Sequence, residues 1–307
     1  MSIQKVSIIG LGALGIMYAH HFTQKLPKEN VRIIADEKRI QKYQSEGVFC
    51  NGERCEFHYV TPEEPVEPAD LLIFTVKFHG LEEAIRLAKH HVGENTIIIS
   101  ALNGIISEEL IGQAYGFDHV LYCVAQGMDA VKVGNQLTYA HKGILVFGDK
   151  EPGVMSEKTK SLSEFFDSIE FPYQVDTNMN HRLWGKFMLN VGVNQTVAVY
   201  KGNYGTVQQE GEARNTMIAA MREVIAVSEK AGVPLSEEDL QYWLDVLSKL
   251  SPEGKPSMAQ DVDAKRPSEV ELFSGTVIQL GKKYGIDTPV NKMLYEKIKE
   301  MEAAYVH

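Results

Sequence analysis

Short apolar segments alternate with longer helix-like segments through the first half of the chain. Helical patterns follow the first glycines to about Lys25 and run again from Leu81 to His91. The predicted strands are 6–9, 31–35, 70–76, 96–100 and 120–125. Strands that are apolar on every side are typical of a parallel sheet that helices cover on both faces. This half of the sequence therefore predicts an α/β domain.

The pattern changes after about Val175, where every periodic segment becomes helical. The predicted helices are 180–200, 207–231, one that a capping box opens at Ser236, 269–284, and one that Thr288 and Pro289 open. We place the domain boundary at this change, with an α/β domain at 1–175 and an all-helical domain at 176–307. No Pro/Ser-rich linker separates them, so we expect a packed interface between the domains.

One segment before this boundary differs from the rest of the first half. Between Gln136 and Phe147, two strand-like segments flank Lys142 and Gly143. A lysine-glycine turn between two strands is typical of a hairpin. We therefore predict an antiparallel addition at the edge of the parallel sheet.

Length, charge and cysteine content limit the class of protein. The 307 residues allow two domains, and 31 Lys and Arg against 41 Asp and Glu give a net charge of −10. We expect neither nucleic acid nor an anionic membrane as a partner of such a chain. Three cysteines favour reduced thiols in the cytoplasm, with a bridge between Cys50 and Cys55 as the alternative. The scattered histidines suggest no metal site.

A glycine motif follows the first predicted strand and opens the first predicted helix. It reads Gly10-Leu11-Gly12-Ala13-Leu14-Gly15 and matches the G-x-G-x-x-G pattern of dinucleotide-binding turns in the context that the pattern requires. Gly10 allows the tight turn, Gly12 admits a pyrophosphate, and Gly15 lets the helix pack closely on the strand. Free N–H groups at the helix N-terminus then attract the phosphates.

The end of the second strand bears on the choice of dinucleotide. Asp36 stands where a carboxylate bonds the ribose 2′-hydroxyl of NAD and repels the 2′-phosphate of NADP. Lys38 and Arg39 follow closely and could hold that phosphate instead, or be solvated charges at the start of a helix. The sequence leaves both NAD(H) and NADP(H) open.

Three polar residues interrupt an otherwise apolar helix at 184–194. Lys186, Asn190 and Asn194 are spaced so that they share one face. Burying an ammonium and two amides without partners costs several kcal/mol each, about 2–7 for a neutral group. The alternatives are a structural hydrogen-bond network with a snorkelling lysine, or a ligand that meets these groups in a cleft.

Four further polar positions are candidates of the same kind. Lys77 ends the third strand and Asn103 follows the fourth, at the sheet edge where ligands of open parallel sheets bind. Ser257 and Glu269 lie in a polar cluster of the helical domain, where Ser268 could equally cap a helix with Glu269 in its first turn. Site roles and ordinary turns or caps remain open for these positions.

Taken together, these residues resemble the ketopantoate reductase (2-dehydropantoate 2-reductase) family over essentially the whole chain. The resemblance implies an N-terminal Rossmann-type domain, a helical C-terminal domain and a cleft between them. It also implies NADPH-dependent reduction of 2-dehydropantoate to the (R)-hydroxy acid in pantothenate synthesis. The marks that carry it are the 10–15 glycine motif, Thr75-Val76-Lys77, Leu102-Asn103-Gly104, the 186/190/194 helix, and Ser257-Met258-x-Gln260-Asp261 leading to Glu269.

The resemblance assigns roles by position. Lys186 matches the catalytic lysine, which acts as general acid, and Glu269 is grouped with it. The substrate-binding positions are Asn190, Asn194 and Ser257. The positions that line the nicotinamide half of the cofactor are Lys77, Asn103, Ala130 and Glu269. The chemistry of a lysine suits this role independently, because an ammonium can stabilise and protonate the oxyanion that hydride addition to a ketone creates.

Two departures from the family pattern keep alternatives open. Asp36 replaces an arginine that many members use for the 2′-phosphate, and Tyr204 replaces a substrate-contacting asparagine of some members. An NADH-dependent D-2-hydroxyacid dehydrogenase for another branched or aromatic 2-oxo acid is one alternative, and a non-catalytic dinucleotide sensor is another. We expect a monomer or homodimer, which the sequence does not decide.

Overall fold

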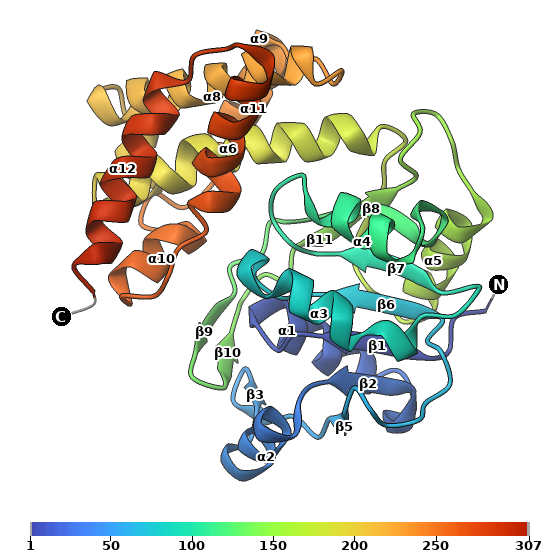
Figure 1. Cartoon of the computed structure of the whole chain (residues 1–307). Coiled ribbons are helices and arrows are strands. Elements are labelled where there is room, and N and C mark those ends of the chain that lie inside the picture. Colours follow the sequence, from blue (N-terminus) through green and yellow to red (C-terminus); the bar gives the residue numbers. More distant parts are fainter. Residues whose placement is uncertain (1, 306–307) are drawn as a thin grey trace. The chain divides into compact units, whose positions relative to one another are not determined.

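The computed structural model describes residues 2–305 and divides into two compact units, Met1–Asn180 and His181–His307. The first unit is built on an eight-stranded sheet in the order β12-β11-β8-β7-β6-β1-β2-β5 (Figure 1). Its strands are β1 (Val6–Ile9), β2 (Val31–Ile34), β5 (His58–Val60), β6 (Leu71–Phe74), β7 (Ile97–Ser100), β8 (Val120–Gln126), β11 (Ile144–Gly148) and β12 (Tyr173–Val175). The units meet in sequence a few residues after the predicted boundary, within the helix that follows β12.

The apolar segments form the centre of this sheet, as predicted. Strands β2, β1, β6, β7 and β8 pair in parallel, with Val6 of β1 opposite both Val31 of β2 and Leu71 of β6. Every residue of β1, β2, β6 and β7 is buried. These strands lack an exposed face because helices cover both sides of the sheet.

The helices of the first unit form two layers. They are α1 (Ala13–Thr23), α2 (Glu37–Glu46), α3 (Leu81–Leu87), α4 (Ser107–Tyr115) and α5 (Glu157–Ser168). On one face α1 and α5 meet through the rings of Phe22 and Phe165, whose centroids lie 6.0 Å apart. The helices α3 and α4 lie on the other face (Figure 1), where the Tyr115 hydroxyl of α4 donates to the Ile85 carbonyl of α3.

The antiparallel addition predicted at 136–147 is confirmed for its second segment, whereas its first segment belongs to another sheet. The strand β11 does run antiparallel to β8, but β12 pairs with its other side and covers that edge. The segment Gln136–Thr138 is β10 of a separate four-stranded sheet, in the order β4-β3-β10-β9. The other strands of this small sheet are β3 (Phe49–Cys50), β4 (Glu53–Arg54) and β9 (Val131–Val133). Its strands have two or three residues each, too few to show a hydrophobic period in the sequence.

The second unit is helical, as predicted. Its elements are α6 (Met179–Val199), which begins at the junction, α7 (Tyr204–Gln208), α8 (Glu212–Lys230), α9 (Glu237–Ser248), α10 (Ser257–Asp263), a π-helix (Glu271–Gly275), α11 (Thr276–Tyr284) and α12 (Pro289–Ala303). The capping box at Ser236 is confirmed: its hydroxyl accepts from the Asp239 N–H, and the Asp239 side chain accepts in return. Within residues 2–305 the helices include none that is long and apolar enough to cross a membrane.

Two predicted helices are divided in the structure. The segment 207–231 breaks before α8 at Gly211, whose φ of +151° does not continue a helix. The segment 269–284 begins later than predicted, at Glu271, and its first turn is a π-helix that leads into α11. Ser268 acts much as the cap that its position suggests, because its hydroxyl accepts from the Val270 N–H at 3.3 Å.

Candidate functional site: a dinucleotide cavity and a polar helix face

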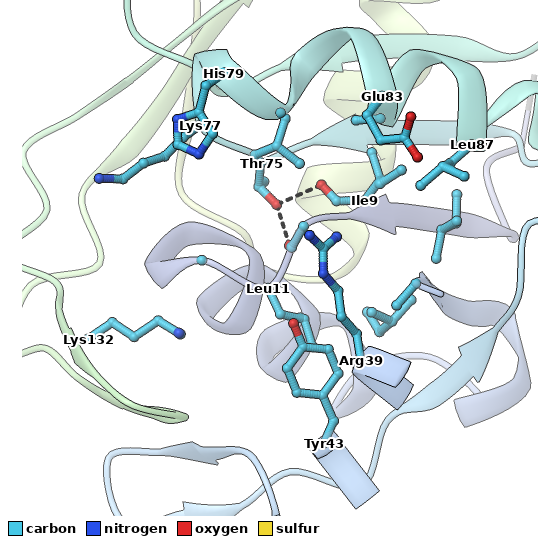
Figure 2. A pocket seen from close by; sticks show the side chains of 18 residues that line it. Ile9, Leu11, Arg39, Tyr43, Thr75, Lys77, His79, Glu83, Leu87 and Lys132 are labelled. Carbon is cyan, nitrogen blue, oxygen red and sulfur yellow. Dashed lines mark hydrogen bonds between the residues drawn. The ribbon is translucent and has the colours of Figure 1, made fainter. Parts of the chain in front are cut away.

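A cavity of about 470 Å³ opens at the carboxyl ends of β1 and β6. The chain leaves β1 toward β2 on one side, and β6 lies on the other side, so this is the point where the strand order reverses. Ligands of open parallel sheets bind at this switch point. The lining residues are Ile9, Gly10, Leu11, Gly12, Ile33, Ile34, Ala35, Arg39, Tyr43, Thr75, Val76, Lys77, His79, Gly80, Glu83, Ala84, Leu87 and Lys132 (Figure 2).

The glycine motif forms the floor of this cavity, and each glycine has its own constraint. Gly10 has a φ of +100°, and a Cβ on Gly15 would lie 2.0 Å from the Gly10 carbonyl oxygen. Gly12 differs, because a Cβ there would meet only the Thr75 carbonyl oxygen, at 3.4 Å. Gly10 and Gly15 therefore serve the fold, whereas the missing side chain of Gly12 leaves room in the cavity itself.

Thr75 joins the glycine turn to the neighbouring strand. Its hydroxyl donates to the carbonyl of Gly10 at 2.6 Å and lies 3.2 Å from that of Ile9 (Figure 2). These bonds occupy carbonyl groups at the end of β1. They hold the turn in place, so the floor of the cavity is set before any ligand binds.

Basic side chains dominate the charged lining. Arg39, Lys77 and Lys132 carry positive charge, and Glu83 carries the one negative charge of the lining. The chain as a whole has a net charge of −10, so this local excess of cations runs against its composition. A cavity with an excess of positive charge attracts a multiply charged anion, and a dinucleotide is such an anion. Its glycine floor and its charge therefore both fit a dinucleotide.

Arg39 enters the cavity, whereas Asp36 serves the start of α2. The Asp36 carboxylate accepts from the Arg39 backbone N–H at 2.8 Å and lies 3.5 Å from the Arg39 Nε. In Figure 2 the guanidinium of Arg39 extends over the cavity above the ring of Tyr43, which comes from the same helix. Lys38, the other predicted cation, does not line the cavity.

The cavity brings together only part of the predicted cofactor set. Gly10, Leu11, Gly12 and Lys77 line it, and Ala13, Leu14 and Gly15 form the first turn of α1 beside it. The lining does not include Asp36, Asn103 or Ala130. Asn103 lies in the bend after β7, and Ala130 directly precedes β9. Their roles toward a cofactor stay predictions.

Four polar or charged residues of the lining were not named from the sequence: Tyr43, His79, Glu83 and Lys132. Lys132 comes from β9 of the small sheet and stands between the exposed Val131 and Val133. Alternation along a strand places Lys132 on the face opposite these valines. The sequence does show a single lysine between two valines, which is the pattern of a strand with one polar face. It does not show that this strand lies beside the glycine turn, so Lys132 could not be identified as a lining residue.

The polar face of the predicted buried helix lies on α6 of the second unit. Asn190 and Asn194 are 5% and 6% exposed. The Asn194 side-chain amide donates to the side-chain oxygen (Oδ1) of Asn190 at 3.2 Å, and the Ser257 hydroxyl donates to the side-chain oxygen (Oδ1) of Asn194 at 3.4 Å. The structure thus brings together the three residues predicted to bind a substrate. It also shows that a hydrogen-bond network joins them.

Lys186 lies one helical turn before Asn190 and is half-buried. Burial lowers the pKa of its ammonium from the usual 10.5 to about 8, because the charged form loses solvation. A lysine with such a pKa is charged at neutral pH and releases its proton more readily than an exposed lysine. Both properties suit a general acid that works near neutrality.

Glu269 lies on the segment that enters the π-helix, where its carbonyl accepts from the N–H groups of Leu272 and Phe273 at 3.0 and 3.1 Å. The residue is half-buried. It belongs to the same unit as α6, so the second unit contains both the predicted catalytic lysine and the predicted carboxylate. Its role, like that of Lys186, stays a prediction.

The cavity lies at the switch point of a parallel sheet, and a helical unit with a polar helix face follows it in the chain. This combination is typical of nicotinamide-dependent oxidoreductases that have two domains. Family models cover nearly the whole chain: "Ketopantoate reductase PanE/ApbA" matches residues 6–152, and "Ketopantoate reductase PanE/ApbA C terminal" matches residues 178–302. The chain belongs to the ketopantoate reductase family and is an oxidoreductase of that type.

Individual relatives are distant but cover the full length. A 2-dehydropantoate 2-reductase of Aquifex aeolicus (strain VF5) is 27% identical over 305 residues, which are 98% of this chain and 97% of the relative. A D-mandelate dehydrogenase structure with NADH and anilino(oxo)acetate has a TM-score of 0.86 at 20% identity, covering 99% of this chain and 100% of that one. A dimeric ketopantoate reductase from Staphylococcus aureus has a TM-score of 0.79 at 21% identity, with 98% and 99% covered. These structures share the fold of this chain, and its family supports a nicotinamide cofactor.

Proposed function

We propose that this protein uses NADPH to reduce a 2-oxo acid to a D-2-hydroxy acid, and that the substrate is 2-dehydropantoate, reduced to (R)-pantoate in pantothenate and CoA biosynthesis. The observation that carries the proposal is the polar face of α6, where Lys186, with its lowered pKa, precedes the hydrogen-bonded Asn190 and Asn194, and where Ser257 of α10 is bonded to Asn194. The name of the Aquifex aeolicus relative supports the choice of substrate. The reduced thiols of all three cysteines support a cytoplasmic location.

The chemistry divides between the bound cofactor and the residues of α6. When bound, the reduced dinucleotide supplies a hydride to the carbonyl carbon of the substrate. Negative charge then develops on the carbonyl oxygen, where the Lys186 ammonium stabilises it and donates a proton from Nζ. The amides of Asn190 and Asn194 and the Ser257 hydroxyl, which are uncharged donors, hold the substrate carboxylate and hydroxyl groups by hydrogen bonds.

The cofactor that we propose is NADP(H). Arg39 extends into the cavity, whereas the Asp36 carboxylate is engaged in capping α2 and lies beside Arg39. A guanidinium can bind a 2′-phosphate through two parallel charged hydrogen bonds. Asp36 keeps NAD(H) as the alternative, because its carboxylate could accept from a ribose 2′-hydroxyl.

A second candidate is an NADH-dependent D-2-hydroxyacid dehydrogenase that acts on another branched or aromatic 2-oxo acid. Tyr204 favours it, because the ring of this residue lies against Gly254, just before the helix that begins at Ser257. A Cβ on Gly254 would lie 3.0 Å from the ring. An aromatic side chain next to a substrate-binding segment suits a larger apolar substrate group.

Replacing Lys186 tests the proposal directly. We expect Lys186→Ala to lower the turnover number by at least about 100-fold, because the transition state loses its proton donor and its charge. The dissociation constant for NADPH should hardly change, because the glycine turn lies in the other unit. Lys230→Ala, which removes an exposed lysine at the end of α8, is the matched control and should keep normal turnover. A folded Lys186→Ala protein with normal turnover would leave the lysine a purely structural role.

A further inference from the structure

The π-helix at Glu271–Gly275 has one backbone donor that its own turn does not satisfy. In a regular α-helix the Ser274 N–H would bond the carbonyl of Val270. Here the Gly275 N–H takes that carbonyl, at 3.0 Å, because the turn is one residue wider. The Ser274 N–H instead donates to the side-chain oxygen of Gln195, at 3.1 Å. A side chain of α6 therefore completes the π-turn.

Gln195 belongs to a largely buried polar network that joins four elements of the second unit. Its amide donates to the Val191 carbonyl of α6 at 2.8 Å and lies 3.4 Å from the Asn291 side-chain oxygen of α12. The Ser274 hydroxyl donates to the same Asn291 oxygen at 3.0 Å. Gln195, Ser274 and Asn291 each have 0% exposure.

The network continues to α8, which fixes Asn291 in turn. The Asn291 side-chain amide donates to a carboxylate oxygen of Glu223 at 2.7 Å and to the Ala220 carbonyl at 3.2 Å. The two carboxylate oxygens of Glu223 also accept from the backbone N–H groups of Val290 and Asn291, at 2.7 and 2.9 Å. Each amide thus has its orientation set by a charged or backbone group, so Gln195 cannot turn its oxygen away from Ser274 without breaking other bonds.

The network adjoins, along the chain, both segments that carry the residues of the proposed chemistry. Gln195 directly follows Asn194, the last residue of the polar face of α6. The π-turn that it completes directly follows the segment with Glu269. One extra residue in a helical turn rotates the preceding chain by about 100° around the axis, so the π-turn decides which way the Glu269 segment faces.

We propose that Gln195 is a positioning residue, which fixes the π-turn and thereby holds Glu269 in its productive place relative to the Lys186, Asn190 and Asn194 face. The inference rests on the proposed function, because it gives Glu269 and Lys186 their roles. An apolar side chain at position 195 would fill the same space but leave the buried Ser274 N–H without an acceptor, so the amide is needed for the π-turn and not for core packing alone.

The test compares Gln195→Met with a matched neighbour. Methionine keeps the length of the side chain but cannot bond the Ser274 N–H. We expect the turnover number to fall by about 10- to 100-fold, the cost of a small misplacement of reacting groups, with little change in the NADPH dissociation constant. The control is Thr196→Val, because the hydroxyl of the fully buried Thr196 has no hydrogen-bond partner among residues 2–305. This variant should keep normal turnover.

Two further measurements separate positioning from general loss of structure. Hydrogen exchange at the Ser274 amide should become faster in Gln195→Met and stay unchanged in Thr196→Val. Should Gln195→Met not fold, Ser274→Ala, which loses only the hydroxyl bond to Asn291, should lower turnover by about 2- to 5-fold.

The outcomes distinguish this inference from the proposed function. A wild-type protein that reduces no 2-oxo acid contradicts the proposed function before any variant is made, and hydrogen exchange at Ser274 still tests the contact. Normal turnover in Gln195→Met, or in Ser274→Ala if the first variant does not fold, would overturn the positioning role.

Discussion

The ammonium of Lys186 sets the pH range in which the proposed reaction can run. Its pKa is lowered to about 8 by burial, and a general acid must carry its proton when the reaction begins. As the pH rises through about 8, the protonated fraction of the free enzyme falls. We therefore expect kcat/KM for the 2-oxo acid to decline above pH 8, well below the range near pH 10.5 in which an exposed lysine loses its proton.

Steady-state rates between pH 6 and 10.5 check this expectation. Lys186→Arg provides the control, because a guanidinium stays charged throughout this range and cannot donate its proton. The variant should keep part of the substrate affinity, lose most of its turnover and show no decline near pH 8. A decline near pH 8 that persists in Lys186→Arg would assign it to another group.

Arg39 and Asp36 favour different cofactors: Arg39 favours NADPH, and Asp36 favours NADH. Loss of the Arg39 guanidinium removes a charged partner of the 2′-phosphate, which is worth about 1.5–3 kcal/mol. Arg39→Ala should therefore raise KM for NADPH by about 10- to 100-fold and leave KM for NADH nearly unchanged. Lys38→Ala is the control, because Lys38 lies next to Arg39 in sequence but does not line the cavity. If wild-type protein already prefers NADH, Asp36 governs the choice and the assignment of Arg39 fails.

At the residue scale, the sequence predicted which residue types gather at the site better than it predicted which way their side chains point. It placed Asp36, Lys38 and Arg39 together at the end of a strand, and only the fold shows that Arg39 reaches the cavity. The 186/190/194 spacing did predict one polar face, because helical periodicity alone determines it. Lys132 and Gln195 could not be found in the same way, since each meets its partners through contacts between elements distant in sequence.

The turn between β1 and α1 shows how one short element serves both fold and ligand. Gly15 packs so closely on the Gly10 carbonyl that a Cβ would overlap with it, whereas Gly12 has ordinary contact distances and an extended backbone with a φ of −71°. Gly15→Val should therefore lower the unfolding temperature. Gly12→Val should keep it and weaken NADPH binding by at least about tenfold, by filling the space of the pyrophosphate.

Thermal unfolding and calorimetric titration of both variants separate these effects. Gly12→Ala offers a milder change at the same position, and its loss of affinity should be smaller than that of Gly12→Val. Normal NADPH affinity in a folded Gly12→Val protein would mean that the pyrophosphate does not approach this turn.

Elements were predictable where their pattern was long and regular. The five apolar strands and the long α6 follow from periodicity, and their burial is as expected. The small sheet and the π-turn were missed for different reasons. Strands such as β3 are too short to show a period, and the π-turn depends on Gln195, a partner outside the element.

A buried carboxyl group makes the stability of the whole molecule depend on pH. Glu108 of α4 is 2% exposed, and burial raises its pKa from 4.5 to about 7, although its carboxylate accepts from the Ser107 hydroxyl at 2.9 Å. A group whose pKa is higher in the folded protein than in the unfolded chain stabilises the folded state. This stabilisation is fully present at pH values below the pKa of the group in the unfolded chain. That contribution is lost as the pH rises from about 4.5 through 7.

Glu108→Gln removes this dependence and keeps an oxygen for the Ser107 hydroxyl. The variant should gain free energy of unfolding relative to the wild type as the pH rises from 4.5 to 7, with a constant difference above that range. Urea unfolding at several pH values measures the difference. A difference that does not vary with pH would show that Glu108 titrates normally in the folded protein.

The central claim about the whole molecule is that it reduces a 2-oxo acid with NADPH as the hydride donor. The most direct test is kcat/KM of the wild-type protein for 2-dehydropantoate and a panel of branched and aromatic 2-oxo acids, each with NADPH and with NADH, and with the chirality of the product determined. We predict the highest value for 2-dehydropantoate with NADPH, and the (R)-hydroxy acid as product. Binding of a dinucleotide without oxidation of either cofactor by any 2-oxo acid would contradict the account and leave a dinucleotide sensor in its place.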